Sequence, residues 1–299
     1  MNRFQTPATA PRLSVLVCTR NRSQKLTRAV ESILANDLDD FELVIVDQST
    51  DDATMDVVAR HADARIRYIR SDTIGLARSR NIAIRASRSE TLVFTDDDCI
   101  CDKRWLSAVL TEFEADRSLA GVFGRVLPYG EGNGGTTCPS VIASMERRVV
   151  DRPAIPHLTL GHGNNMSFRK SAFRRVGLFI ESLGAGTAMK AGEDTEFIYR
   201  ALRARLRFLY SPDPLVYHDN WLPADCFATV LNGYVFAGSA VFTKFAARMD
   251  RLAMRHLIRS AREFVRDRSK RYLFYHLIGA LAGVRYACSG VPILTKGDA

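Results

Sequence analysis

The sequence predicts an α/β fold, with a mostly parallel sheet covered by helices on both faces and a helical C-terminal region. Three observations predict it. Short apolar runs alternate with amphipathic segments through the first hundred residues, as buried parallel strands alternate with covering helices. Polar side chains directly follow several of these runs. Beyond residue 224 the strand signals stop and helical periodicity continues.

Four apolar runs mark the first expected strands. They are Leu13–Val17, Phe41–Val46, Ile66–Ile69 and the run TLVFT before Asp96. Helices are expected between them, because each gap contains amphipathic spacing. Ser23 is expected to cap the first helix, and Asp51 or Asp52 the second. The third helix is expected at Gly75–Ala86. Ligands bind beyond the carboxyl ends of strands in such sheets, so functional residues are expected there.

The regular pattern changes after residue 127. The glycine-rich and proline-rich segment Pro128–Pro139 predicts a surface loop. Short strands are expected at Asn165–Phe168 and around Leu215–His218, and a helix is expected at Gly192–Ala204. From Ala224 the chain reads as helical. We therefore expect a domain at residues 12–220 and a separate helical region at 221–299.

Composition excludes several classes of protein. The 299 residues are 46% hydrophobic and 25% charged, which is ordinary for a globular chain and not for a disordered or fibrous one. Six cysteines are scattered without a CxxC pair, so neither a disulfide scaffold nor a zinc site is expected. The first twelve residues lack the apolar core of a secretory signal, and no membrane-spanning helix is expected. These features predict a cytoplasmic protein.

The positive charge is concentrated near the C-terminus. Residues 221–299 carry +7 of the net charge of +9. Six arginines share one face of an expected helix: Arg248, Arg251, Arg255, Arg259, Arg262 and Arg266. The uncharged run Leu273–Val284 follows them. The pattern fits either a solvated helix face or a peripheral contact with an anionic membrane, which would be the inner face of the cell membrane.

The most informative motif is the carboxylate triplet Asp96, Asp97 and Asp98, directly after an expected buried strand. Three adjacent carboxylates repel one another unless a cation neutralises them. One explanation is capping of a helix that starts near Lys103. The other is a site for Mg²⁺ or Mn²⁺, which bind carboxylates together with the phosphates of a ligand.

Other polar residues occupy comparable positions. Asp47 follows the second strand and either forms a turn or accepts a hydrogen bond from a nucleotide. Glu193 and Asp194 open an expected helix, where the helix dipole or a catalytic role favours a carboxylate. His218 ends an apolar run and is either structural or a metal ligand. Further candidates flank these strands and helices: Thr19, Arg20, Arg78, Arg80, Asn81, Asn164, Asn165 and Met166.

In this order and spacing, seven segments resemble family 2 of the nucleotide-sugar glycosyltransferases. They are SVLVCTRNR, ELVIVDQST, GLARSRN, FTDDDC, GNNMSFRK, GEDTEF and LVYH, within residues 12–220. The resemblance implies the GT-A fold, a Rossmann-like α/β architecture. It also implies inverting transfer of a hexosyl or related sugar from a nucleoside-diphosphate sugar to a hydroxyl, in the synthesis of cell-surface glycan or glycolipid.

The resemblance also implies roles for individual residues. Asp47 resembles a contact to the nucleotide base, and Asp96 resembles the carboxylate near the ribose and the metal. Asp98 and His218 resemble ligands of Mn²⁺ or Mg²⁺, and Asp194 resembles the general base, with Glu193 beside it. Thr19, Arg20, Arg80 and Asp97 fall in the donor region. Asn164, Asn165 and Met166 fall in the acceptor pocket.

Partners follow from the same resemblance. We expect a nucleoside-diphosphate sugar, with a UDP-sugar favoured, a glycan or lipid-linked acceptor, and no nucleic acid. A first alternative is a phosphohydrolase that resembles the haloacid dehalogenases, with Asp96 as nucleophile. It fits poorly because the motif follows the fourth strand and not the first. A second alternative is a module that binds anionic surfaces through the basic C-terminal region.

Overall fold

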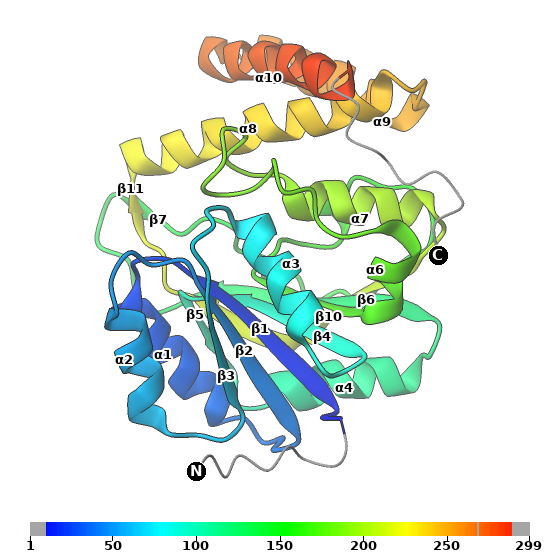
Figure 1. Ribbon diagram of the computed structural model, residues 1–299. Helices are drawn as coiled ribbons and strands as arrows, with labels where there is room; N and C mark the ends of the chain where they lie inside the picture. Colours follow the sequence, from blue (N-terminus) through cyan, green and yellow to red (C-terminus); the bar gives the residue numbers. More distant parts are fainter. Residues whose placement is uncertain (1–9, 268, 289–299) are drawn as a thin grey trace.

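The computed structural model describes residues 10–267 and 269–288. Its main feature is a nine-stranded mixed sheet that carries helices on both faces (Figure 1). The expectations about a secretory signal and about the end of the C-terminal region involve residues 1–9 and 289–299, which lie outside the described residues.

The sheet has its parallel strands in two groups. Its spatial order is β3 (Ile66–Arg70), β2 (Phe41–Asp47), β1 (Leu13–Thr19), β4 (Thr91–Asp96), β9 (Asn165–Arg169), β6 (Leu119–Pro128), β10 (Arg207–His218) and β5 (Cys99–Cys101), with β8 (Arg148–Val150) also paired to β10. Strands β9, β5 and β8 are antiparallel to their neighbours, and the others run in one direction. The prediction of an α/β fold with a mostly parallel sheet is confirmed.

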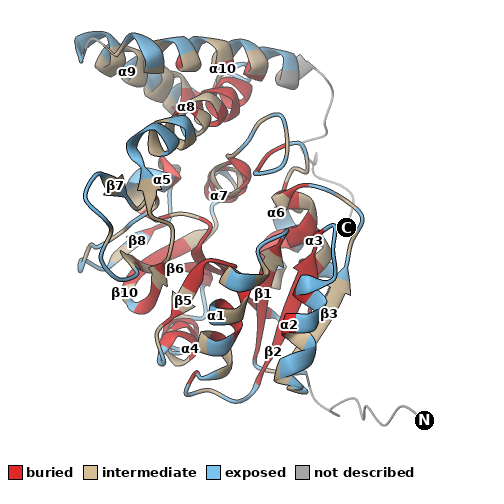
Figure 2. Ribbon diagram, turned by 90° about the vertical axis from the view of Figure 1, so that its left-hand side faces the viewer, coloured by how far each residue is buried: buried red, intermediate tan, exposed pale blue. Residues whose placement is uncertain are grey.

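Helices cover both faces of this sheet. Helices α1 (Ser23–Leu34), α2 (Ala53–His61) and α4 (Trp105–Ala115) bury their apolar faces in one core. The other core contains α3 (Leu76–Ala86), α6 (Lys170–Val176) and α7 (Glu193–Arg203). Figure 2 shows the buried residues concentrated in the strands and on the helix sides that face them. These two cores fix the carboxyl ends of the strands in space.

Several predicted boundaries needed correction. Ser23 is the first residue of α1 and Arg22 is its N-cap, while Asp52 caps α2 without a side-chain hydrogen bond. The strand predicted around Leu215–His218 is only the end of the longer strand β10. Strands β5, β6 and β8 were not predicted. The carboxylate triplet caps no helix, because β5 follows it and Arg104 is the N-cap of α4. The capping explanation of the triplet is therefore wrong.

The predicted loop at residues 128–139 contains a short strand that ties it to the C-terminal region. Strand β7 (Thr136–Thr137) pairs with β11 (Leu222–Pro223), which leads into helix α8 (Ala224–Ala246). The short helix α5 (Pro156–Thr159) follows on the same side of the sheet as α7. The loop is thus held close to the start of the C-terminal helices.

The described residues beyond 223 form three helices, and the periodicity predicted that this part is helical. Helix α8 lies across the top of the α/β part, with α9 (Arg251–Arg266) and α10 (Lys270–Cys288) above it (Figure 1). Helix α10 approaches α8 closely, because a Cβ atom built on Gly279 would lie 2.3 Å from the carbonyl oxygen of Phe236. The arginine stripe is one residue shorter than predicted, since Arg248 precedes α9 in a turn.

The expectation that no helix is suited to cross a membrane also needs correction. Helix α8 is long and apolar enough by composition, with a mean hydropathy of 1.4 over its most apolar window. However, 44% of that window is buried inside the protein. Val241, Phe242 and Phe245 form a core with Leu183 and Tyr199 of the α/β part. In this structure α8 is a core helix that attaches the C-terminal region.

A buried ion pair joins α7 to α8, and its loss is expected to destabilise the protein. The carboxylate of Glu196, which is fully buried, contacts Lys244 Nζ at 3.1 Å and Arg200 Nη2 at 2.8 Å. Glu196→Gln is expected to lower the free energy of unfolding by about 3–5 kcal/mol, because the buried Lys244 and the largely buried Arg200 both lose a charged partner. Urea denaturation measures this change.

The matched control is Glu263→Gln, which removes the exposed pair between Glu263 and Arg259. Its expected effect is about 0–1 kcal/mol, because solvent screens exposed charges. Equal effects of the two substitutions would contradict the assignment of Glu196 as the buried link between α7 and α8.

Candidate functional site

A cavity of about 870 Å³ opens beyond the carboxyl ends of β1 and β4 and extends to the C-terminal helices. Its lining includes the residues after β1, the carboxylate triplet after β4, and the first turn of α7. It also includes side chains of α8, α9 and α10. The cavity therefore joins candidates that are far apart in the sequence.

The triplet is held by groups that follow β1. The hydroxyl of Thr19 donates a hydrogen bond to Asp97 Oδ2 at 2.7 Å. Arg22 contacts both neighbouring carboxylates, with Nη1 2.8 Å from Asp97 Oδ1 and Nη2 2.6 Å from Asp98 Oδ2. Because Asp97 and Asp98 are buried, this guanidinium supplies part of the positive charge that the triplet needs.

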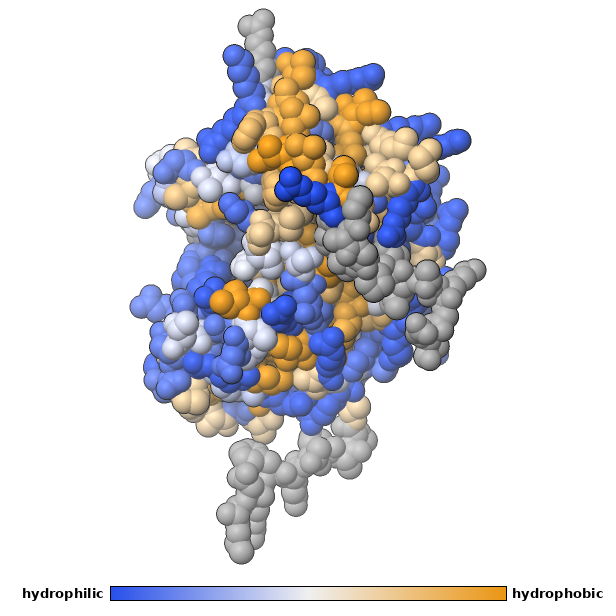
Figure 3. All heavy atoms as spheres, turned by 45° about the horizontal axis from the view of Figure 1, so that its top comes forward, coloured by the Kyte–Doolittle hydropathy of each residue, from blue (hydrophilic) through white to orange (hydrophobic). Residues whose placement is uncertain are grey.

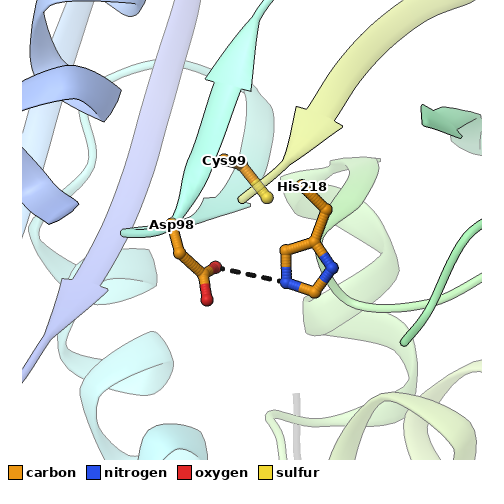
Figure 4. Close-up of side chains that lie close together, drawn as sticks. All are labelled: Asp98, Cys99 and His218. Carbon is orange, nitrogen blue, oxygen red and sulfur yellow. Dashed lines mark ion pairs between the residues drawn. The ribbon is translucent and has the colours of Figure 1, made fainter. Parts of the chain in front are cut away.

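His218 faces the triplet from the end of β10 (Figure 4). Its Nε2 atom lies 3.4 Å from Asp98 Oδ1. Its Nδ1 atom lies 2.9 Å from the carbonyl oxygen of Pro139, so Nδ1–H donates to that oxygen. This hydrogen bond orients the ring and leaves Nε2 directed at Asp98.

Burial and neighbouring charges move the carboxyl pKa values apart. Burial raises the pKa of Asp97 to about 7, and it also raises the pKa of Asp96. Burial alone would raise the pKa of Asp98 too, but His218 and Arg22 outweigh it and lower that pKa to about 2. Burial opposes protonation of His218, yet Asp98 raises the pKa of the imidazole. Asp98 is therefore the member of the triplet that most strongly keeps its charge.

The residues present fit a divalent cation. Ligand atoms of Asp98, Cys99 and His218 all lie within 4.8 Å of one another. Burial raises the pKa of the Cys99 thiol well above its ordinary value, so this sulfur is protonated and a poor ligand for a hard ion. One carboxylate and one oriented imidazole remain, a set that suits Mn²⁺ or Mg²⁺ with further oxygens from a ligand.

Arg80 holds the two carboxylate groups of the cavity together. Its Nη1 atom is 2.8 Å from Glu193 Oε1, and its Nη2 atom is 3.1 Å from both Asp96 Oδ1 and the carbonyl oxygen of Gly163. A Cβ atom on Gly163 would lie 2.8 Å from this guanidinium, so only glycine leaves room for it. Arg80 lines the cavity but is committed to these partners. It positions the site, and its contact with the donor stays a prediction.

Glu193 and Asp194 differ in environment although they are adjacent. Burial and the charge of Asp194 raise the pKa of Glu193 to about 7, against the opposing effect of Arg80. Asp194 lies at the cavity wall and is half-buried. Its Oδ2 accepts a hydrogen bond from the backbone N–H of Gly163 at 2.9 Å, and Oδ1 accepts one from Thr195 at 2.6 Å. Asp194 is thus oriented by the backbone, and among the described residues it forms no ion pair within 4.0 Å.

The structure separates the three predicted acceptor residues. Asn164 lines the cavity, and both polar atoms of its buried amide lack a hydrogen-bond partner among the described residues. Asn165 is structural, because its amide bonds to Trp105, Arg125 and Pro214. Met166 is fully buried in a core. Asn164 lies in the turn before β9, whereas Asn165 and Met166 are neighbours within the strand and point to opposite faces.

Asp47 ends β2, the strand end at which the sequence placed it. It is fully buried and accepts hydrogen bonds from the Tyr68 hydroxyl at 2.7 Å and from the Ser49 backbone at 2.8 Å. Asp47 does not line the cavity, whereas its neighbour Gln48 does. Thr19 and Arg20 line the cavity as expected. The contact between Asp47 and a nucleotide base stays a prediction.

Sequence reasoning missed residues that complete the site. Arg22 lies in the quoted SVLVCTRNR segment, but nothing in the sequence shows that it, and not Arg20, contacts the triplet. The carbonyl of Pro139 orients His218, and no side-chain pattern can reveal a backbone acceptor. Arg78, one of the two arginines considered, instead pairs with Glu181 at 3.0 Å.

The part of the cavity among the C-terminal helices contains uncharged histidines. Burial, with a smaller effect from neighbouring imidazoles, lowers the pKa of His157 and His256 to about 4. The groups that face them are His162 and Asp194 beside His157, and His276, Glu263 and Arg259 beside His256. Both rings are therefore neutral at pH 7.

These histidines predict a loss of stability in acid. The unfolded chain binds a proton at each imidazole below about pH 6.5, and the folded chain does so only near pH 4. The free energy of unfolding therefore falls as the pH drops from about 6.5 towards 4. In urea titrations at pH 7 and pH 5, His256→Phe is expected to lose less stability than the wild type. An equal loss in both proteins would contradict this prediction.

Comparisons with known proteins agree with the fold and the order of the motifs. Residues 14–177 match the model of the family described as glycosyl transferase family 2, which is more than half of the chain. The chain belongs to this family. Its fold is the GT-A fold, a Rossmann-like α/β architecture.

Individual relatives support the assignment. The pre-mycofactocin glycosyltransferase of Mycobacterium tuberculosis is 28% identical over 70% of this chain and 43% of its own length. A Campylobacter jejuni enzyme, GalNAc(5)-diNAcBac-PP-undecaprenol beta-1,3-glucosyltransferase, is 33% identical over 41% of this chain and 40% of its own length. The chain thus spans less than half the length of these curated relatives.

Solved structures share the fold. TarS (residues 1–349) of S. aureus in complex with UDP-GlcNAc has a TM-score of 0.59 and 19% identity, over 77% of this chain and 65% of that one. The mannosyltransferase PcManGT of Pyrobaculum calidifontis, in complex with GDP-Man and Mn²⁺, has a TM-score of 0.53 and 17% identity, over 96% and 89%.

Proposed function

We propose that this chain is a metal-dependent, inverting glycosyltransferase that moves a sugar from a nucleoside-diphosphate sugar to a hydroxyl acceptor. The observation that carries the proposal is that one cavity contains two kinds of group. Asp98 and His218 fit a divalent cation, and Asp194 is a carboxylate that a backbone hydrogen bond orients. The phosphohydrolase alternative fits less well, because Asp96 pairs with Arg80 and the chain belongs to another family.

The donor is proposed to bind at the strand ends. Arg22 and the polar groups after β1 and β4 surround the place where a diphosphate would meet Asp98 and His218. A bound Mn²⁺ or Mg²⁺ would neutralise charge on the departing diphosphate. A UDP-sugar is favoured, since the TarS structures contain UDP-GlcNAc and UDP, while PcManGT contains GDP-Man.

Asp194 is proposed to act as the general base. The acceptor hydroxyl transfers its proton to the Asp194 carboxylate as its oxygen bonds to the anomeric carbon and the bond to the diphosphate breaks. One displacement of this kind inverts the configuration at that carbon. The buried amide of Asn164 offers an unpartnered donor and acceptor to sugar hydroxyls in the same cavity.

The activity can be tested without knowledge of the acceptor, because water can replace it slowly. Purified protein is incubated with UDP-, GDP-, dTDP- and CDP-sugars, and release of the nucleoside diphosphate is measured with Mn²⁺ and with EDTA. We expect release from one donor class, lost in EDTA. The thermal unfolding midpoint is recorded with each nucleoside diphosphate in parallel. The proposed function would be contradicted if no donor released its nucleoside diphosphate and no nucleoside diphosphate stabilised the protein.

We further propose that residues 12–220 form the catalytic domain and that 221–299 hold it on the inner face of the cell membrane. On α10, four exposed side chains share one helix face: Phe274, Leu277, Leu281 and Val284. Exposed arginines lie beside them on α9: Arg255, Arg259, Arg262 and Arg266. Figure 3 shows hydrophobic side chains gathered over this end of the molecule, with hydrophilic ones around them. An apolar stripe beside basic residues suits an anionic lipid surface, and a glycan or lipid-linked acceptor is proposed.

The membrane contact predicts a specific dependence on lipid. The protein is expected to float with vesicles that contain phosphatidylglycerol and not with pure phosphatidylcholine vesicles. Leu277→Ser with Leu281→Ser is expected to reduce the bound fraction at least about 10-fold, because apolar area no longer enters the interface. The control is Met55→Ser on α2, an exposed apolar residue of the α/β part. Equal binding of all variants would contradict the contact.

A further inference from the structure

The cavity has two ends of different chemistry. The strand end contains Arg22, the carboxylate triplet and His218. The other end, here named the helical end, is lined by apolar residues of two helices: Phe227, Leu231 and Phe242 of α8, and Leu257 and Phe264 of α9. Among the described residues of α8, α9 and α10, no Asp, Glu, Lys or Arg lines the cavity.

The sequence of α9 shows that this apolar lining is not a result of an apolar composition. The helix has five arginines, and all five are exposed. The residues that it directs into the cavity are His256, Leu257, Ser260 and Phe264. A helix this basic presents an uncharged face to the cavity, so the lining does not follow from the overall composition of the C-terminal region.

One polar pair of the helical end is satisfied within the protein. His276 Nδ1 lies 2.7 Å from the hydroxyl of Ser239. The ring of His256 packs against Phe242, with 4.5 Å between ring centroids, and against His157 at 5.7 Å. Because these imidazoles are neutral at pH 7, they act here as flat aromatic walls. The helical end therefore suits apolar groups better than sugars or phosphates.

Asp194 lies between the two ends. The backbone of Gly163, which follows His162 in the cavity lining, donates to its Oδ2 atom. On the other side, Gly192 begins α7 directly against α8, because a Cβ atom there would lie 3.4 Å from Ala237 Cβ. An acceptor hydroxyl at Asp194 thus has the strand end on one side and the helical end on the other.

We infer that the acceptor has an apolar portion that occupies the helical end while its hydroxyl lies at Asp194. This inference rests on the proposed function. The volume of about 870 Å³ lies towards the upper end of the range of ordinary ligand cavities. An apolar cavity that stays empty destabilises a protein, and an apolar group that fills it restores the lost contacts.

An apolar portion of this kind is either an aliphatic chain, as in a lipid-linked acceptor, or an aromatic group on a soluble one. Three probes with the same sugar separate these sources: methyl, octyl and 4-nitrophenyl β-glucoside. Binding of each is measured by calorimetry below the micelle concentration. We expect octyl or 4-nitrophenyl glucoside to bind at least about 10-fold more tightly than methyl glucoside. Tighter binding of the octyl form indicates a chain, and tighter binding of the nitrophenyl form indicates an aromatic group.

A blocking variant locates the binding. Ser260→Phe places a ring in the helical end from α9 and is expected to abolish the preference for the apolar probes. Ile258→Phe is the matched control, because Ile258 is on α9 but 53% exposed outside the cavity. Both variants must keep the wild-type unfolding midpoint and its shift with the nucleoside diphosphate. If Ser260→Phe does not fold, Leu257→Asn replaces it, since an unpaired amide also weakens apolar binding there.

The outcomes separate this inference from the proposed function. Nucleotide binding without any preference for an apolar probe would overturn the inference and leave the transferase proposal standing. A preference that Ser260→Phe fails to reduce would overturn it as well, because the apolar group would then bind elsewhere. If the wild type does not bind a nucleoside diphosphate, both the inference about the acceptor and the transferase proposal are overturned. A preference lost in Ser260→Phe and kept in Ile258→Phe supports the inference.

Discussion

Asp194→Asn is expected to reduce sugar transfer by about 10²–10⁴-fold, the range that a general base contributes. The amide keeps the shape of the carboxylate and one acceptor oxygen for the N–H of Gly163 or Thr195, but it cannot take the acceptor proton. Binding of the nucleoside diphosphate should stay within about twofold, since Asp194 does not contact the Asp98–His218 pair. The measurement compares kcat with the dissociation constant of the nucleotide in the same preparation.

The control is Asp225→Asn, the same chemical change at an exposed position in the first turn of α8. It should leave both quantities unchanged. Transfer by Asp194→Asn within about threefold of the wild type would contradict the role of Asp194. A parallel loss of nucleotide binding would instead show that the substitution disturbs the donor end through Gly163.

Asp98→Asn is expected to weaken nucleoside diphosphate binding in Mn²⁺ by about 100-fold or more. The substitution removes a charged oxygen ligand from the proposed cation site, and loss even of groups that merely support a ligand costs 10–100-fold. Without metal the affinity should stay equal or rise, because Arg22 loses one carboxylate partner and keeps its positive charge. The ratio of the affinities with and without Mn²⁺ is therefore the readout.

Cys99→Ala is the matched control for the cation site. The thiol lies beside Asp98 and His218 (Figure 4) but is protonated, so its removal should leave the Mn²⁺ effect intact. His218→Ala should behave like Asp98→Asn. A Mn²⁺ effect that survives both ligand substitutions, or disappears with Cys99→Ala, would contradict the assignment of the ligands.

The regular part of the fold was accessible from the sequence because its strands are buried on both faces. A continuous apolar run is typical of a strand in a sheet that helices cover on both faces. Strands β1 and β2 contain such runs, Leu13–Val17 and Phe41–Val46. The same logic placed the carboxylate triplet at a strand end. Strand β9 was also found, but its antiparallel insertion between β4 and β6 depends on long-range packing that no local pattern records.

The contacts within the site were less accessible from the sequence than the strand ends, for physical reasons. Asp47 sits at a strand end as predicted, but Tyr68 and Arg70 on the neighbouring strand take its carboxylate. Asn164 lies in the turn before β9, whereas Asn165 begins the strand and bonds to groups inside the structure. A sequence cannot show that Arg80 pairs with Glu193, 113 residues later. Such pairings exist only after folding.

The most direct test of the account is the position of Mn²⁺ in crystals grown with Mn²⁺ and UDP or GDP. Anomalous scattering locates the ion independently of any assay. The account predicts one strong peak within coordination distance of Asp98 and His218, next to the diphosphate. A nucleotide visible in the cavity with its Mn²⁺ bound away from both residues, or with no ion at the diphosphate, would contradict the central claim.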